Sequence, residues 1–299
     1  MQKIISNIWC NGDAEAAGNF YASVFAGASS HVESSYPSEG LADFQRAMAG
    51  KALTVSVDIG GTAFTLINAG DEFRPNPSIS FFVNIDPLQF DDETAARAHL
   101  DAMWRDLSSG GRELMSLGEY PFSKHYGWVE DRYGVSWQLI LTDPDGASRP
   151  YIVPSLMFAG PVQNRANEAI DFYVNLFDDA EAGSRFPYDE QTGPAAAKAL
   201  AFGDFRIGDQ WFAVMDSGVE QDFSFTNGVS LEVLCVDQAE IDRLWDALSA
   251  EPEAEQCGWL VDQFGVSWQI VPQNMGELMQ RPQAFEHMMA MKKLVIDDF

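Results

Sequence analysis

The sequence is poor in positive charge, and this shortage argues against two classes of partner. Only 18 Lys and Arg residues stand against 45 Asp and Glu residues, so the formal net charge is −27. A field of that sign repels phosphate backbones and anionic lipid, and we therefore expect no nucleic-acid partner and no membrane partner. Solubility or a salt-rich cytoplasm accounts for the acidity, and attraction of a cationic ligand is the alternative interpretation.

Long apolar runs and cysteine pairs are also missing. No segment reaches the roughly 18 consecutive apolar residues of a membrane span, and the apolar start of the chain is too short and too polar for a signal-peptide core. The spacings of the three cysteines, Cys10, Cys235 and Cys257, suit neither a zinc cluster nor a redox pair. A chain of 299 residues can form two domains without disulfides or structural metals. We therefore predict a cytoplasmic protein with reduced cysteines.

Histidine is scarce. The four histidines are His31, His99, His125 and His287, and no two of them have the i, i+2 or i, i+4 spacing that brings both onto one face of an element. His125 directly precedes a predicted strand and could act as an acid or base near neutral pH, so it is the one weak catalytic candidate. An ordinary loop histidine is the alternative. The sequence predicts no cofactor.

An internal duplication is the main positive feature of the sequence, because four blocks recur in the same order. The matched pairs are residues 19–25 with 171–177, 64–70 with 212–218, 104–107 with 245–248, and 128–138 with 259–269. The last pair reads Trp-Val-Glu-Asp-Arg-Tyr-Gly-Val-Ser-Trp-Gln in one copy and Trp-Leu-Val-Asp-Gln-Phe-Gly-Val-Ser-Trp-Gln in the other. We predict a first domain at 1–143, a linker at 144–151, a second domain at 152–275 and a C-terminal helix or tail at 276–299.

Periodicity divides each domain again, into two β-α-β-β-β units. Residues 4–10 alternate as a half-buried strand, and the apolar positions within 14–24 then follow helical spacing. Residues 52–59 and 63–68 flank Gly60-Gly61, a two-residue turn that predicts a hairpin. The pattern restarts with a strand at 79–85. These hairpin-rich units predict an α+β fold with mainly antiparallel strands.

The Phe20-Tyr21 pair on the first helix and the terminal Asp-x-x-Gly-x-x-Trp-Gln strand resemble the vicinal-oxygen-chelate superfamily. That superfamily includes glyoxalases, ring-cleaving dioxygenases and bleomycin-resistance proteins. Residues 127–138 and 258–269 look like its PhnB-like branch, and the resemblance spans essentially residues 1–275. It implies tandem glyoxalase-like domains, each built of two β-α-β-β-β units that form a curved sheet. It also implies an intramolecular pseudo-dimer of the two domains, with a further homodimer left open.

The resemblance indicates where metal ligands would stand in metal-dependent members, on the first and last strands of a unit. The first-strand position falls near Ser6, and its counterpart in the second domain falls near Pro154. The last-strand positions are Gln138 and Gln269, which are neutral amides and weak ligands for a divalent ion. We therefore predict no metal site.

The tryptophans of the repeated signature divide into two kinds. Trp137 and Trp268 precede the glutamines, so strand alternation places them on the opposite face, in the core. Trp128 and Trp259 open their strands and are expected to line a pocket. The predicted ligand-binding set is Ser6, Trp128, Gln138, Trp259 and Gln269. Aromatic rings with a few amide and hydroxyl groups suit a flat or amphipathic small molecule.

The sequence leaves three functions open and does not decide whether the chain is an enzyme. The leading hypothesis is a small-molecule binding protein similar to the drug-resistance members. The alternative is a metal-dependent lyase, isomerase or dioxygenase, and a structural module is the third. The PhnB-like branch often carries a 3-demethylubiquinone methyltransferase label, which the sequence does not support. Neither Gly60-Gly61 nor Gly110-Gly111 forms the glycine-rich turn after a parallel strand that adenosylmethionine binding of the usual kind needs.

Overall fold

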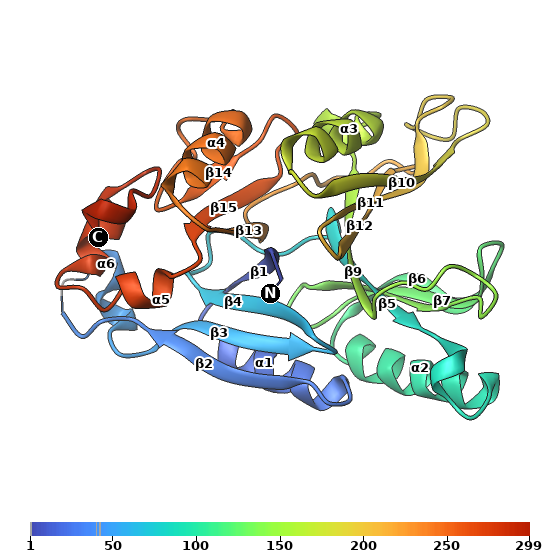
Figure 1. Cartoon of the computed structure of the whole chain (residues 1–299). Coiled ribbons are helices and arrows are strands. Elements are labelled where there is room, and N and C mark those ends of the chain that lie inside the picture. The colour runs from blue at the N-terminus through green and yellow to red at the C-terminus, as the bar shows by residue number, and fades with distance from the viewer. Residues whose placement is uncertain (1, 40, 42) are drawn as a thin grey trace.

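The chain forms four successive units of strands and helices, as the periodicity predicts (Figure 1). The computed structural model describes residues 2–39, 41 and 43–299. The strands are β1 (Ile4–Cys10), β2 (Ser29–Ser35), β3 (Ala52–Ile59), β4 (Thr62–Asn68), β5 (Ile79–Ile85), β6 (Arg112–Tyr120), β7 (Ser123–Glu130), β8 (Ser136–Leu141), β9 (Ile152–Phe158), β10 (Ala180–Pro187), β11 (Leu200–Ile207), β12 (Gln210–Asp216), β13 (Val229–Cys235), β14 (Trp259–Val261) and β15 (Ser267–Pro272). The helices are α1 (Ala14–Val24), α2 (Glu93–Ser108), α3 (Ala166–Leu176), α4 (Gln238–Leu248), α5 (Met275–Leu278) and α6 (Ala284–Ala290).

The local predictions hold in most places, and two segments differ from them. β3 and β4 pair antiparallel across Gly60-Gly61, whose positive φ angles of 59° and 83° suit the predicted hairpin turn. The fourth unit passes from α4 to β14 with no strand among residues 249–258, a stretch that contains Pro252 and several glutamates. The C-terminal segment forms α5 and α6, two short helices in place of one continuous helix.

Two sheets run through the molecule, and each is shared by both sequence repeats. The seven-stranded sheet has the order β14-β15-β13-β1-β4-β3-β2, and the eight-stranded sheet has the order β10-β11-β12-β9-β5-β8-β7-β6. The repeats meet where β1 pairs antiparallel with β13 and where β5 pairs antiparallel with β9. Each repeat thus supplies one unit to each sheet.

Helices cover one face of each sheet. Figure 1 shows α1 and α2 of the first repeat on one side of the molecule and α3 and α4 of the second repeat on the other. α1 contacts β2, β3 and β4, and α4 contacts β13, β14 and β15. Strands of both repeats therefore pair within each sheet, whereas each of these helices packs on strands of its own repeat.

The repeated signature is a buried clasp that joins the two units of one repeat. Tyr21 on α1 and Trp137 on β8 both donate hydrogen bonds to Oδ2 of Asp131, each at 2.9 Å. The backbone amides of Tyr133 and Val135 donate to Oδ1 of the same carboxylate at 2.8 and 3.1 Å. Four donors on one carboxylate explain why this motif contains an aspartate.

The second repeat builds the same clasp from the matching residues. Tyr173 and Trp268 donate to Oδ2 of Asp262 at 2.6 and 2.8 Å. Trp137 and Trp268 are 0% and 1% exposed, which confirms their predicted place in the core. The Phe-Tyr helix and the Trp-Gln strand are therefore parts of one structural motif, because they meet at one aspartate.

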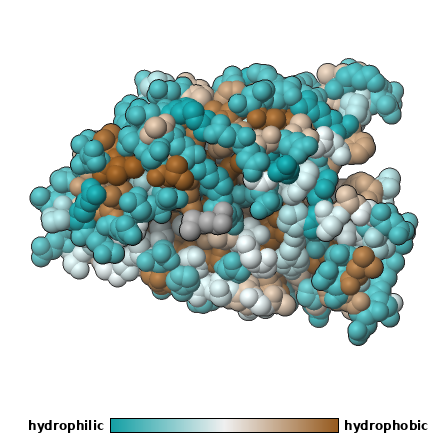
Figure 2. Space-filling view, viewed as in Figure 1, coloured by the Kyte–Doolittle hydropathy of each residue, from teal (hydrophilic) through white to brown (hydrophobic). Residues whose placement is uncertain are grey.

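None of the helices in the described part of the chain is long and apolar enough to cross a membrane. On the face shown in Figure 2, hydrophilic residues predominate and hydrophobic residues form separate groups.

Candidate functional site

Each sheet has a second face, directed away from helices α1 to α4, where side chains can meet a ligand. Strand alternation and register place Asn7, Thr65, Ser230, Glu232 and Gln269 on this face of the seven-stranded sheet. We call it the seven-stranded face, and it also carries Thr54, Trp9 and Trp259. Both repeats contribute to it, since β1, β3 and β4 belong to the first and β13 to β15 to the second.

The predicted residue Ser6 does not lie on this face. It stands opposite Leu231 and beside Phe64, both buried on the helix side, and it is 2% exposed. Its neighbour Asn7 takes the outward position. Pro154 is likewise paired with the core residue Phe81, so Ser155 is the outward residue of β9. A strand reverses its face at every residue, so an error of one position reverses the side chain's direction.

Two hydrogen-bonded pairs of polar side chains lie at the centre of the seven-stranded face. Asn7 Nδ2 donates to Glu232 Oε2 at 2.7 Å, and Gln269 Nε2 donates to Ser230 Oγ at 2.9 Å. Asn7 Oδ1 and Ser267 Oγ are buried and have no hydrogen-bond partner among the described residues. A native fold leaves few buried polar atoms unpaired, so such atoms mark a place where a ligand or water can bind.

Aromatic rings stand beside these polar groups. Trp9 contacts Trp259 at 5.9 Å and Phe73 at 5.1 Å between ring centroids, both edge to face. The indole nitrogen of Trp9 donates to the Gly70 carbonyl at 2.8 Å, which fixes its ring. Trp259 stands opposite Gln269 on the neighbouring strand. The predicted pair Trp259 and Gln269 thus shares one face with Asn7 and Glu232.

Glu232 carries the unusual charge of this face. Burial raises the pKa of its carboxyl, and the hydrogen bond from Asn7 opposes that rise. The side chain still keeps some exposure to solvent. A carboxylate that is poorly hydrated yet reachable can bind a ligand proton or cation strongly.

The corresponding face of the eight-stranded sheet, which we call the eight-stranded face, has polar side chains that bond to one another. Tyr126 donates to Gln138 Oε1 at 2.6 Å, Gln138 Nε2 donates to Ser80 Oγ at 2.8 Å, and Trp128 donates to Ser136 Oγ at 2.7 Å. Gln138 and Trp128, two residues of the predicted ligand-binding set, lie on this face, and both side chains form hydrogen bonds with neighbouring side chains. Ser155 Oγ is the buried polar atom left without a partner on this face among the described residues.

Two phenylalanines meet over the middle of the eight-stranded face. The rings of Phe82 on β5 and Phe202 on β11 lie 6.3 Å apart between centroids, although β9 and β12 stand between their strands. Strands three places apart are separated by roughly 14 Å in a flat sheet, so the rings must reach over the intervening strands. Phe186 extends this aromatic group from β10.

The repeat alignment shows which residues differ between the two faces. Glu232 takes the place of Phe82, at an offset of 150 residues, while Thr54 takes the place of Phe202 and Asn7 that of Ser155, both at an offset of 148. The seven-stranded face therefore lacks the aromatic pair and has a carboxylate and a threonine hydroxyl in its place. It is the better candidate for a functional site.

The oxygen donors on the seven-stranded face do not fit a transition-metal site of the superfamily. Glu232 is a single carboxylate, and Asn7 and Gln269 offer only neutral amide oxygens, which are weak ligands for such an ion. Across residues 2–39, 41 and 43–299, no group of three His, Cys, Asp or Glu side chains could hold a metal ion. Zinc, iron and nickel prefer imidazole, thiolate or several carboxylates.

His125 lies on neither the seven-stranded face nor the eight-stranded face. It is part of β7, two residues from Gly127, which packs against Trp104 on α2. Its Nε2 lies 2.6 Å from Oδ1 of Asp101, also on α2. The side chain therefore belongs to the helix side of the eight-stranded sheet. His31 pairs with Glu33 on the edge strand β2, at an exposed position.

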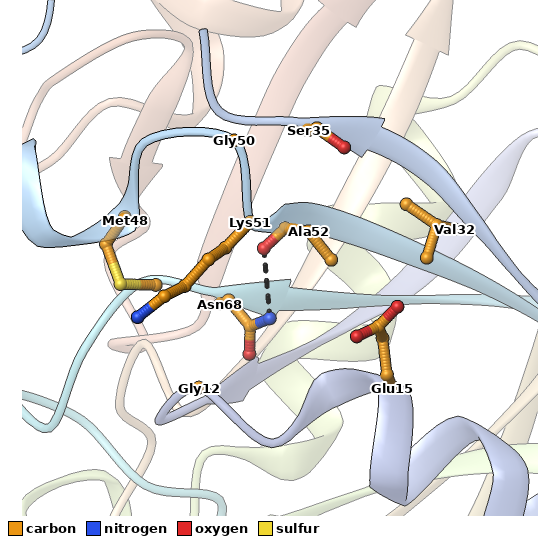
Figure 3. A pocket seen from close by; sticks show the side chains of 9 residues that line it. All are labelled: Gly12, Glu15, Val32, Ser35, Met48, Gly50, Lys51, Ala52 and Asn68. Atoms are coloured by element: carbon orange, nitrogen blue, oxygen red, sulfur yellow. Dashed lines mark hydrogen bonds between the residues drawn. The ribbon is translucent and has the colours of Figure 1, made fainter. Parts of the chain in front are cut away.

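A separate cavity of about 300 Å³ lies beside the start of α1 (Figure 3). Its polar lining includes Glu15 on α1, Lys51 directly before β3, and Asn68 at the end of β4. Asn68 accepts from the amide of Ala14 and donates to the Ala52 carbonyl, both at 3.0 Å, so its side chain is occupied in holding these elements together. This cavity is on the helix side of the sheet and is not part of the seven-stranded face.

Asn7, Glu232 and Phe82 are the residues that sequence reasoning missed. Residues 229–235 read Val-Ser-Leu-Glu-Val-Leu-Cys, so a glutamate stands inside an apolar strand. The matching strand at 79–85 has a phenylalanine at that position. A comparison of the repeats for unmatched charge would have identified Glu232, because charges are rare in buried strands.

Comparisons with known proteins agree with this architecture. The family model described as 3-demethylubiquinone-9 3-methyltransferase matches residues 2–140 and 150–271. A search of the curated proteins found no match. Among solved structures, glyoxalase I from Zea mays is 11% identical, with 92% of this chain and 94% of that chain covered and a TM-score of 0.52.

A second solved structure is similar to half of the chain. It is a Bacillus cereus protein described as a 3-demethylubiquinone-9 3-methyltransferase, PhnB protein. It is 32% identical, covers 47% of this chain and 100% of its own, and has a TM-score of 0.39. The family match in two halves confirms the predicted relation to PhnB-like proteins, and the Zea mays structure confirms the tandem glyoxalase-like fold.

Proposed function

The chain belongs to the family described as 3-demethylubiquinone-9 3-methyltransferase, with a tandem glyoxalase-like fold, and from this premise we propose that it binds a small molecule on the seven-stranded face. One observation carries the proposal. At the positions where the eight-stranded face has Phe82 and Phe202 in contact, the seven-stranded face has Glu232 and Thr54. Unpaired Asn7 Oδ1 and Ser267 Oγ lie on the same sheet.

The proposed binding needs no methyl transfer. A methyltransferase that uses adenosylmethionine in the usual way holds it at a glycine-rich turn after a strand of a parallel sheet. Here β1 leads into α1 through Asn11-Gly12-Asp13, which is not such a turn. We expect no heat of binding when adenosylmethionine is titrated into the protein.

A ligand screen tests the proposal. We expect at least one compound to raise the melting temperature of the wild-type protein, because a ligand that binds only the folded state stabilises it. The double variant T54F/E232F carries the residues of the eight-stranded face, and we expect it to lose that response. Phe82→Leu, on the other face, is the matched control and should keep it.

Two results would contradict the proposal. One is a broad screen in which no compound stabilises the wild-type protein. The other is a ligand that stabilises the double variant as well as the wild type, since that ligand must then bind elsewhere. The melting temperatures without ligand show whether each variant is folded.

A further inference from the structure

The seven-stranded face presents hydrogen-bond acceptors at its centre. Asn7 Nδ2 donates to the Glu232 carboxylate, and the reverse amide orientation would place two oxygens against each other, so Asn7 Oδ1 is the atom left unpaired. Gln269 Nε2 is likewise used by Ser230. Glu232 is bonded through Oε2, and within the described residues its second oxygen has no partner. A ligand that satisfies these oxygens must supply donors.

The rings beside the acceptors favour a positive charge. Trp9 and Trp259 adjoin this polar centre, and Phe73 packs on Trp9. Aromatic faces attract cations, and an indole face does so most strongly. The formal net charge of −27 also raises the local concentration of cations around the whole molecule. The unpaired acceptors, the aromatic rings and the negative net charge all favour a positively charged ligand with hydrogen-bond donors.

We infer that the ligand of the seven-stranded face presents a protonated nitrogen with N–H donors, an ammonium or amidinium group, to Glu232 and Asn7, while an apolar ring lies along Trp9 and Trp259. The inference rests on the proposed function and adds the chemical class of the ligand. Charge-assisted hydrogen bonds to Glu232 hold the nitrogen, and a neutral or anionic compound of the same shape lacks them. The eight-stranded face has Phe82 at this position and offers no such partner.

Three small probes of similar shape test the ligand class. Benzylamine is a cation with N–H donors at neutral pH, benzyl alcohol is neutral, and benzoate is an anion. Binding is followed by saturation-transfer NMR of each probe. We expect benzylamine to bind about tenfold more tightly than benzyl alcohol, or better, because a hydrogen bond to a charged group is stronger than a neutral one. We expect no binding of benzoate.

Two variants separate Glu232 from the general negative field. Glu232→Gln keeps the shape of the side chain and removes its charge, so benzylamine should fall to the affinity of benzyl alcohol. Glu253→Gln removes the same charge at an exposed position of the loop before β14 and should retain the preference. Equal melting temperatures would show that both variants are folded.

Failure of this inference differs from failure of the proposed function. If benzyl alcohol binds as tightly as benzylamine, the ligand class is wrong. If the preference survives in Glu232→Gln, Glu232 does not hold the cation and the inference fails. In both cases the broad screen with the double variant still decides the proposed function separately. The ligand class is also wrong if the three probes fail and the broad screen finds a neutral ligand that the double variant loses. If neither the probes nor the screen find a ligand, both proposals fall.

Discussion

At the scale of single residues, the aspartate of each clasp combines full burial with a complete set of donors. Burial raises the pKa of Asp131 to about 6 from 3.8, against the opposing effect of its hydrogen bonds from Trp137, Tyr133, Tyr21 and Val135. Burial raises the pKa of Asp262 in the second repeat as well. The carboxylate form thus costs free energy in the folded state, and the donors around its oxygens reduce that cost without removing it.

This balance predicts a pH dependence of stability. Because the folded pKa of Asp131 lies above the unfolded value, its contribution is fully present below pH 3.8 and is lost as the pH rises through about 6. The loss amounts to about 3 kcal/mol on the scale of 1.36 kcal/mol per pKa unit. Urea unfolding of wild type and Asp131→Asn between pH 4 and pH 7, roughly the window of this titration, should show a free-energy difference that shrinks as the pH rises.

The control for this prediction is Asp91→Asn, which removes one carboxylate at an exposed position. Asp131→Asn is also expected to be less stable at every pH, because an amide cannot accept from all four donors. A difference between wild type and Asp131→Asn that stays constant with pH would show that the buried carboxyl does not titrate in this window.

At this scale, residues of the repeated motif were predictable from the sequence, and isolated residues were not. Gln269 and Trp259 could be found because they belong to a repeated motif, and they do share a face with the polar centre. Ser6 was one position from the outward residue Asn7, since the chain pattern around Phe20-Tyr21 does not fix the register of β1 to a single residue. Contacts such as Asn7 with Glu232 join residues far apart in sequence, so no local pattern predicts them.

At the scale of elements, the local order of strands and helices was predictable, but their pairing was not. Alternation and turn chemistry identify β1, β3, β4 and β5 because these signals lie within a few residues. The pairing of β1 with β13 links opposite ends of the chain, and each strand could satisfy its backbone with many other partners. Only the complete set of burial and register constraints selects the observed order.

The C-terminal segment is an element with a testable structural role. The amides of Cys257 and Gly258 donate to the carbonyls of Met291 and Lys292 at 2.9 and 2.7 Å, next to β14 at the border of the seven-stranded sheet. Leu294 is fully buried nearby, in a cluster with Val271, Leu278, Ala284 and Phe299. The segment thus protects an edge strand that would otherwise be open to pairing.

Leu294→Ala should destabilise the protein by about 2 to 5 kcal/mol, because it leaves a cavity in this cluster. The matched control is Leu88→Ala, whose side chain is 70% exposed and whose loss should cost less than about 0.5 kcal/mol. Chemical denaturation measures both values. Equal stability of the two variants would mean that the segment does not contribute to the folded state.

At the scale of the whole molecule, the sharing of sheets makes the two repeats dependent on one another. Each repeat has its own clasp and helices, but separation would open the edges of β1 and β5 in one half and of β9 and β13 in the other. An exposed strand edge has unpaired backbone N–H and C=O groups, which can pair with a strand of another chain. The predicted linker at 144–151 therefore separates the two sequence repeats, but both sheets contain strands from each side of it.

Expression of residues 1–147 and 148–299 as separate chains tests this dependence. We expect each half alone to associate into dimers or larger particles, and an equimolar mixture to form a particle of about the 33.1 kDa mass of the intact chain. Multi-angle light scattering measures the masses. Two halves that remain stable, monomeric and non-interacting would contradict the prediction.

The covalent link between the repeats also affects how the two faces can change over time. In a symmetric pair of identical chains, the two equivalent faces have the same sequence, so any substitution appears on both at once. In this chain a mutation at position 82 or 202 alters one face and leaves positions 54 and 232 as they were. Duplication within one chain thus lets one face fill with phenylalanine while the other keeps a carboxylate at the matching position.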